Sequence, residues 1–179
     1  MGAEFWRYYA PLRGDVAATL EELRQREFEA GQYHRSHLHP ATIRQAMLNA
    51  GADGTRSILD MERTSPSPEP AAVSPVPLAS LLAIFGTDRP TRQMVERAFR
   101  IRDSEALDEL IEEIGRGEGR YFILYRDDEP AEVFFCGYSY DLGGPPLHLT
   151  RRCSGPRPPP RFLDSQSLIS AAGSAELGC

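Results

Sequence analysis

The sequence predicts an α+β fold, in which a small antiparallel or mixed sheet is covered by about four to five helices. Two observations predict it. The segments "YFILY" and "AEVFFCGY" have the aromatic and β-branched composition of paired strands, and several earlier segments place apolar residues at helical spacing. These helices do not alternate regularly with strands, so a parallel α/β sheet is not expected. We assign the fold to a single globular domain over residues 3–140.

The composition favours one acidic, cytosolic domain. The chain has 179 residues, of which 41% are hydrophobic, and a formal net charge of −6. A negative protein is not broadly attracted to nucleic acid or to anionic membranes. Every basic residue is arginine, which fits a GC-rich bacterial coding sequence. Three cysteines without a C-x-x-C spacing indicate neither a disulfide framework nor a zinc site. No secretory or membrane-spanning segment is predicted.

The first elements are a strand and a helix. "FWRYYAPL" is rich in aromatic residues and stops at proline, which is typical of a short strand with Trp6 and Tyr8 on its buried face. Helical spacing then begins after Asp15, the predicted N-cap, and stops at Gly31.

The middle of the chain is less regular. A second helix is predicted with Pro40 in its first turn and Gly51 after its end. "TRSILDM" is interpreted as a brief strand centred on Ile58 and Leu59. The proline-rich segment "TSPSPEPAAVSPVP" is interpreted as a surface crossing or an edge strand, because proline removes backbone donors.

Three further helices precede the paired strands. We predict them over Leu78–Phe85, over Thr91–Arg102, and around the apolar positions between Leu107 and Ile114. "RDDEP" then forms the turn of a hairpin between the two apolar strands.

Residues 141–179 differ from the rest of the chain. This tail contains six of the 15 prolines and little apolar periodicity, so we expect it to be disordered. A shifted reading frame in GC-rich DNA would give a similar composition and stays open as an alternative.

Three of the four histidines lie together in "QYHRSHLHP", at His34, His37 and His39. Their spacing is compatible with a metal site, which needs converging ligands and rigid support. The segment lies between Gly31 and Pro40, where a loop is expected. We therefore interpret it as a polar connection, and the metal site as the alternative.

The candidate nucleic-acid site is residues 78–102, where two helices joined at Gly86 have the outline of a helix-turn-helix. The second helix carries Arg92, Arg97 and Arg100, and arginine is the commonest reader of guanine. Residues 103–118, however, carry seven acidic residues and one arginine, which can neutralise the basic helix.

No linear catalytic motif is present, so we predict no catalytic residue and no cofactor. Cys136 follows two phenylalanines in a predicted strand, where cysteine usually packs as a small apolar residue. An enzyme without linear motifs stays open, with a site built from separated carboxylates and tyrosines, among them Tyr138. The carboxylates available for such a site are Asp60, Glu62, Asp127 and Asp128.

Aromatic residues at the predicted strands favour contact with another protein, because exposed tyrosine and tryptophan are enriched in interfaces. The sequence therefore predicts a non-catalytic protein-interaction or binding module in the cytoplasm, with no membrane association. A DNA-binding regulator and an enzyme without linear motifs are the two alternatives. The partner and the oligomeric state are left open.

Overall fold

The structure is a computed structural model that describes residues 3–102 and 104–140. The predicted tail, residues 141–179, lies outside the described residues. The described strands form one mixed sheet in the order β1-β5-β4-β3-β2. Strands β1, β5 and β4 are antiparallel, and β4, β3 and β2 are parallel. Their bounds are β1 Phe5–Pro11, β2 Arg63–Thr64, β3 Ala72–Pro75, β4 Gly119–Arg126 and β5 Glu129–Tyr138.

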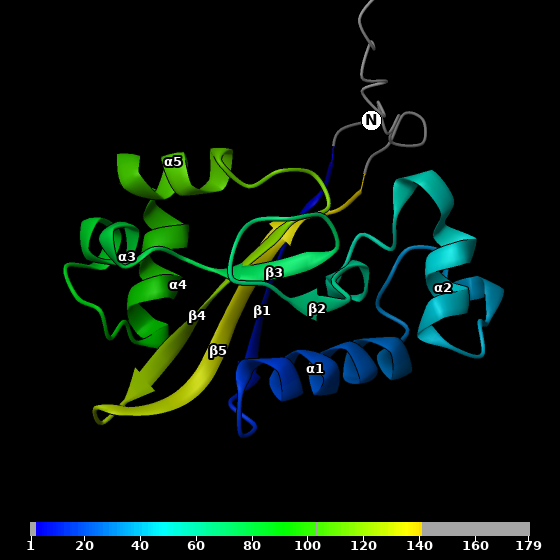
Figure 1. The fold of residues 1–179 in the computed structure, drawn as a ribbon, viewed down its shortest axis with the longest axis horizontal. Coiled ribbons are helices and arrows are strands. Elements are labelled where there is room, and N and C mark those ends of the chain that lie inside the picture. The colour runs from blue at the N-terminus through cyan, green and yellow to red at the C-terminus, as the bar shows by residue number, and fades with distance from the viewer. Residues whose placement is uncertain (1–2, 103, 141–179) are drawn as a thin grey trace, which may run out of the picture. The chain divides into compact units, whose positions relative to one another are not determined.

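Helices cover both faces of this sheet. Figure 1 shows α3, α4 and α5 together on one side and α1 and α2 on the other. The predicted α+β class is confirmed. The bounds of the helices are α1 Val16–Ala30, α2 Ile43–Ala50, α3 Leu78–Phe85, α4 Arg92–Ile101 and α5 Glu105–Glu112.

Two apolar cores result, one on each face, because successive side chains of a strand point to opposite faces. Along β5, Val133 and Phe135 pack with Trp6 and helix α1 in the first core. Phe134 and Cys136 pack with the residues of α3, α4 and α5 in the second core. Strand β5 is therefore buried on both faces, as its continuous apolar sequence requires.

Helix boundaries follow the predicted caps in most cases. The Asp15 side chain accepts a hydrogen bond from the Ala18 N–H, and Gly31 ends α1 in the left-handed region with φ 66°. Helix α2 differs from the prediction because Thr42 is its N-cap and accepts from the Gln45 N–H. Pro40 therefore precedes the helix instead of lying in its first turn.

Two predictions for the middle of the chain were wrong. Ile58–Asp60 forms a short 3-10 turn, not a strand, because the Ser57 and Asp60 side chains accept the backbone N–H groups of Leu59 and Thr55. Ala72–Pro75 is not a surface crossing or an edge strand. It is β3, which lies between β2 and β4, with Val73 fully buried.

The hairpin prediction was confirmed. Strands β4 and β5 pair along their length, and the turn between them has positive φ at Asp127 (52°) and Asp128 (63°). A two-residue turn in which both residues have positive φ matches the twist of the antiparallel strands that it joins.

Candidate functional site

Strand β1 forms an open edge of the sheet. Its inner side pairs with β5, and two bonds fix the register: Leu12 N–H to Ala131 O at 3.0 Å and Ser139 N–H to Glu4 O at 3.0 Å. In an antiparallel pair, alternate residues bond across to the neighbouring strand. The even-numbered residues of β1 therefore bond to β5, and the N–H and C=O groups of Phe5, Arg7 and Tyr9 point away from it. No described residue hydrogen-bonds to these outward groups.

Aromatic rings and arginines lie beside this edge, on the side of helix α4. The Arg7 guanidinium lies over the Phe99 ring of α4, 5.1 Å from its centre. The Phe5 ring stacks on Phe99 with 6.1 Å between the ring centres. We call Phe5, Arg7, Tyr9, Arg92 and Phe99 the edge surface.

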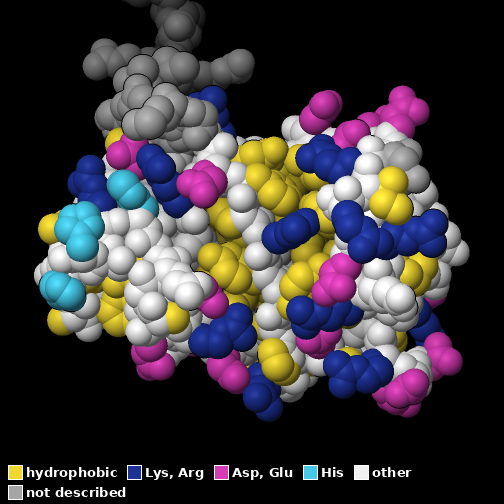
Figure 2. Space-filling view, turned by 180° about the vertical axis from the view of Figure 1, so that it is seen from behind, with side chains coloured by type: hydrophobic (Ala, Val, Ile, Leu, Met, Phe, Trp, Pro, Cys, Tyr) yellow, Lys and Arg dark blue, Asp and Glu magenta, His cyan; other side chains and the backbone are white. Residues whose placement is uncertain are grey.

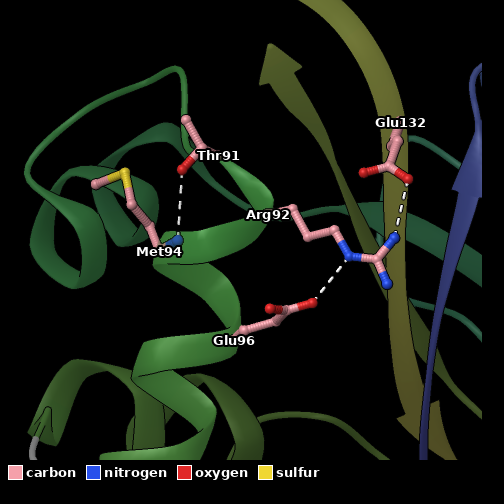
Figure 3. Close-up of polar contacts among 5 residues, drawn as sticks. All are labelled: Thr91, Arg92, Met94, Glu96 and Glu132. Atoms are coloured by element: carbon pink, nitrogen blue, oxygen red, sulfur yellow. Dashed lines mark hydrogen bonds and ion pairs between the residues drawn. The ribbon is translucent and has the colours of Figure 1, made fainter.

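Arg92 connects α4 to both neighbouring strands. Its guanidinium lies 4.3 Å from the centre of the Tyr9 ring. It also donates to Glu96 Oε1 at 2.9 Å and to Glu132 Oε1 on β5 at 3.1 Å (Figure 3). The Thr91 side chain caps the helix immediately before Arg92 by accepting the Met94 N–H. These bonds place the start of α4 against the open edge.

The other arginines of α4 point to solvent. Arg97 and Arg100 are exposed, and neither forms an ion pair with a residue in the described ranges. Figure 2 shows the side opposite to that of Figure 1, where β1 lies: hydrophobic side chains form a band down its middle, with arginines over and beside the band. Acidic side chains also lie beside the band in this view, so the positive charge near the edge is that of the exposed Arg7, Arg97 and Arg100 and not of the whole side.

The opposite side of β1 is closed by α1 and the 3-10 turn. Tyr8 is partly buried there, and burial, followed by the nearby charge of Glu27, raises its pKa to about 12. Its phenol stays neutral at physiological pH. A partner at the edge would therefore meet the side chains of the edge surface more readily than those of the α1 side.

The helix-turn-helix outline is present only as an order of elements. Helices α3 and α4 are connected by residues 86–91, a longer segment than the three or four residues of the typical motif. Arg92 is held by Glu96, Glu132 and Tyr9, whereas Arg97 and Arg100 are free to make new contacts. The DNA-binding role of these three arginines stays a prediction.

The predicted histidine loop is present between α1 and α2. His34, His37 and His39 lie in or beside the short 3-10 turn Ser36–Leu38, and the His34 N–H donates to Thr55 O at 2.7 Å. Within residues 3–102 and 104–140, no group of three His, Cys, Asp or Glu side chains is arranged to hold a metal ion.

The four carboxylates considered for catalysis do not form one cluster. Burial, followed by the charges of Asp60 and Glu62, raises the pKa of the Tyr140 phenol, so these two acids lie near the same side chain. Asp60 is buried near Gly54 and Tyr140, beyond the end of β5, whereas Asp127 and Asp128 lie in the turn before its start. Tyr138 lies on the other face of the sheet, against Phe5. Cys136 is buried, and burial raises its pKa to about 12, as expected for a thiol that only packs.

Sequence reasoning included Tyr9 among the strand aromatics that favour a contact surface, but it missed Arg7 and Glu132. The available signal was Arg7 in the middle of the short aromatic segment "FWRYYAPL", which also contains Pro11 at the end of the strand. Arginine, lysine and proline within a strand are typical of the edge of a sheet. The partners Arg92 and Glu132 are 40 positions apart, so no local pattern could connect them.

The structure is an α+β domain in which β1 pairs with β5 on one side and has no neighbouring strand on the other side among the described residues. No family model, no curated protein and no solved structure matches the chain. Among the residues that the structure describes, no helix has the length and apolar content to cross a membrane.

Proposed function

We propose that this protein is a non-catalytic cytosolic binding module that accepts an extended segment of a partner protein as an additional strand beside β1. One observation carries the proposal: the outward N–H and C=O groups of Phe5, Arg7 and Tyr9 have no partner among the described residues. In strand addition, main-chain hydrogen bonds supply affinity and flanking side chains supply specificity.

The charge of the edge surface favours an acidic partner segment. Arg7 lies at the centre of the open edge and makes no ion pair with a described residue, and exposed Arg97 and Arg100 add positive charge on α4. An aspartate or glutamate opposite Arg7 would form a favourable cross-strand pair.

Self-association along the same edge is disfavoured. The antiparallel register that pairs Phe5, Arg7 and Tyr9 of two copies places one Arg7 opposite the other. Like charges directly opposite each other destabilise a strand pair. Charged residues at this position are one way in which proteins prevent contact between identical edges.

The test starts with extended peptides selected from a random library on the full chain. Arg7→Pro removes one outward N–H. Proline is tolerated at this edge position because that N–H has no partner in the sheet. Arg7→Ala is the matched control, which removes the side chain and keeps the N–H. We expect selected peptides to be acidic, and their affinity to fall by about tenfold or more in Arg7→Pro, which corresponds to about 1.4 kcal/mol, and by less in Arg7→Ala.

Equal losses in the two variants would contradict strand addition and favour side-chain recognition alone. N-methylation of the peptide gives a second test that does not depend on the folding of Arg7→Pro. In an added strand, every second peptide amide donates to β1, and the amides between them point away from it. Methyl groups on the first set should abolish binding, and methyl groups on the second set should not. Equal effects of the two sets would also contradict the proposal.

A further inference from the structure

Helix α3 presents an exposed apolar stripe. Leu78 and Leu82, one turn apart, are 57% and 47% exposed. Ala79 and Ala83, the next residues along the helix, are exposed as well. Leu81, Ile84 and Phe85 make the contact of α3 with the second core, and the exposed leucines are not part of that core. Apolar helix faces of this kind are common protein contact sites.

A groove lies between helices α3 and α5. Leu78 and Leu82 do not line it, but each directly precedes one of its lining alanines, Ala79 and Ala83, along α3. The groove has a volume of about 230 Å³. Its lining is formed by Ala79, Ser80 and Ala83 of α3 and by Ala106, Glu109, Leu110 and Glu113 at α5. Four of its seven lining residues are Ala79, Ala83, Ala106 and Leu110, and the small side chains on α3 allow a second backbone to approach closely.

The rim on the α5 side is negatively charged. Glu105, Glu109 and Glu113 are spaced by four residues, so they follow one side of the helix. All three are exposed and form no ion pair with another described residue. Asp108 of the same helix, by contrast, is paired with Arg102. No described residue therefore compensates the negative charge of these three glutamates by an ion pair.

We propose that the groove between α3 and α5 binds a cationic amphipathic helix of a partner protein. Its apolar side would cover Leu78, Leu82 and the alanines, and its lysines or arginines would pair with the glutamate rim. The charge complementarity selects this occupant over a neutral or acidic helix. This surface is independent of the β1 edge.

A second copy of the chain does not supply such a helix from its described residues. Helix α4 carries the most arginines among the described helices, but its apolar side is already occupied, since Val95 is fully buried against the sheet. The groove therefore fits a different protein.

The test uses a synthetic helical peptide of leucine and lysine with one apolar face, and the full chain at physiological salt. Two double variants are compared with the original protein. One combines Leu78→Ser and Leu82→Ser, and the other combines Glu109→Gln and Glu113→Gln. The charge-matched control is Glu62→Gln with Glu129→Gln, two exposed acids that have no ion pair with a described residue. We expect each groove pair to weaken binding by about tenfold and the control pair to change it by less than twofold.

Two peptides check the specificity. A peptide of the same composition in scrambled order has no apolar face, and a leucine–glutamate peptide has the wrong charge; neither should bind. Binding of the scrambled peptide with equal affinity, or an equal loss in the control pair, would overturn the proposal in favour of general charge attraction. Dimerisation of the full chain that is lost in the Leu→Ser pair would assign the groove to a second copy and would also overturn it.

Discussion

The guanidinium of Arg92 lies over the ring of Tyr9, 4.3 Å from its centre, and so connects helix α4 to the edge strand of the sheet. The same guanidinium bonds to Glu132 on β5, which lies next to β1. One side chain thus contacts both strands and positions α4 beside the open edge. Any partner strand added to β1 would pass along this contact.

Replacement of Arg92 by alanine should destabilise the fold modestly. The substitution removes the contact with Tyr9 and two partly exposed ion pairs, which together contribute about 1–2 kcal/mol. Arg97→Ala on the same helix removes no described contact and should change the free energy of unfolding by less than about 0.5 kcal/mol. Urea unfolding of both variants checks this prediction, and equal effects would contradict it.

Gly137→Ala should destabilise the pairing of β1 with β5 strongly. An added Cβ at this position would collide with the Trp6 ring and with the Glu118 carbonyl oxygen. Overpacking of this kind costs about 3 kcal/mol or more where backbone must move. Gly14→Ala is the control. Nothing lies within 4 Å of a Cβ added at this position, and only the positive φ of 69° adds strain, about 1 kcal/mol. Thermal unfolding should rank the two variants in this order.

Asp60 should make stability fall as pH rises. Burial raises the pKa of its carboxyl, although hydrogen bonds from Thr55 oppose the shift. A raised pKa means that the folded state favours the protonated form. Its stabilisation is complete below the unfolded pKa and is lost as pH rises through the folded pKa.

Asp60→Asn removes this titration and keeps an oxygen for the Thr55 donors. The free energy of unfolding should therefore fall less steeply between pH 4 and pH 7 in this variant than in the original protein. Chemical unfolding at several pH values gives the two slopes. A steeper fall in the variant would show that the sign of the shift is wrong.

Cys136 should be unreactive toward alkylating reagents in the folded protein. The thiolate is the reactive form, and burial, which raises the pKa to about 12, leaves almost none of it at pH 8. Mass spectrometry of the peptide that contains Cys136 should show modification only after denaturation. Rapid modification under native conditions would place this thiol near solvent.

Local sequence patterns were sufficient where a single element determines its own structure. The caps at Asp15 and Gly31, the helix that ends before Gly86 and the turn at Asp127 and Asp128 each depend on residues a few positions apart. Such short-range preferences can be recognised without knowledge of the tertiary structure.

The errors occurred where distant segments determine the structure. Ala72–Pro75 is too short to show a period, and it becomes a buried strand only because β2 and β4 lie on either side of it. Ile58 and Leu59 have strand composition, but the hydrogen bonds made by Ser57 and Asp60 turn the chain there. The edge surface depends in the same way on a strand and a helix more than 80 positions apart, Arg7 and Phe99.

Residue-resolved amide hydrogen exchange of the full chain, measured alone and with a selected extended peptide, tests the central claim most directly. The amides of Phe5, Arg7 and Tyr9 should exchange rapidly in the free protein and become protected in the complex, whereas those of Trp6, Tyr8 and Ala10 should be protected in both. Protection of the first set in the free protein, or no change on peptide binding, would contradict the account.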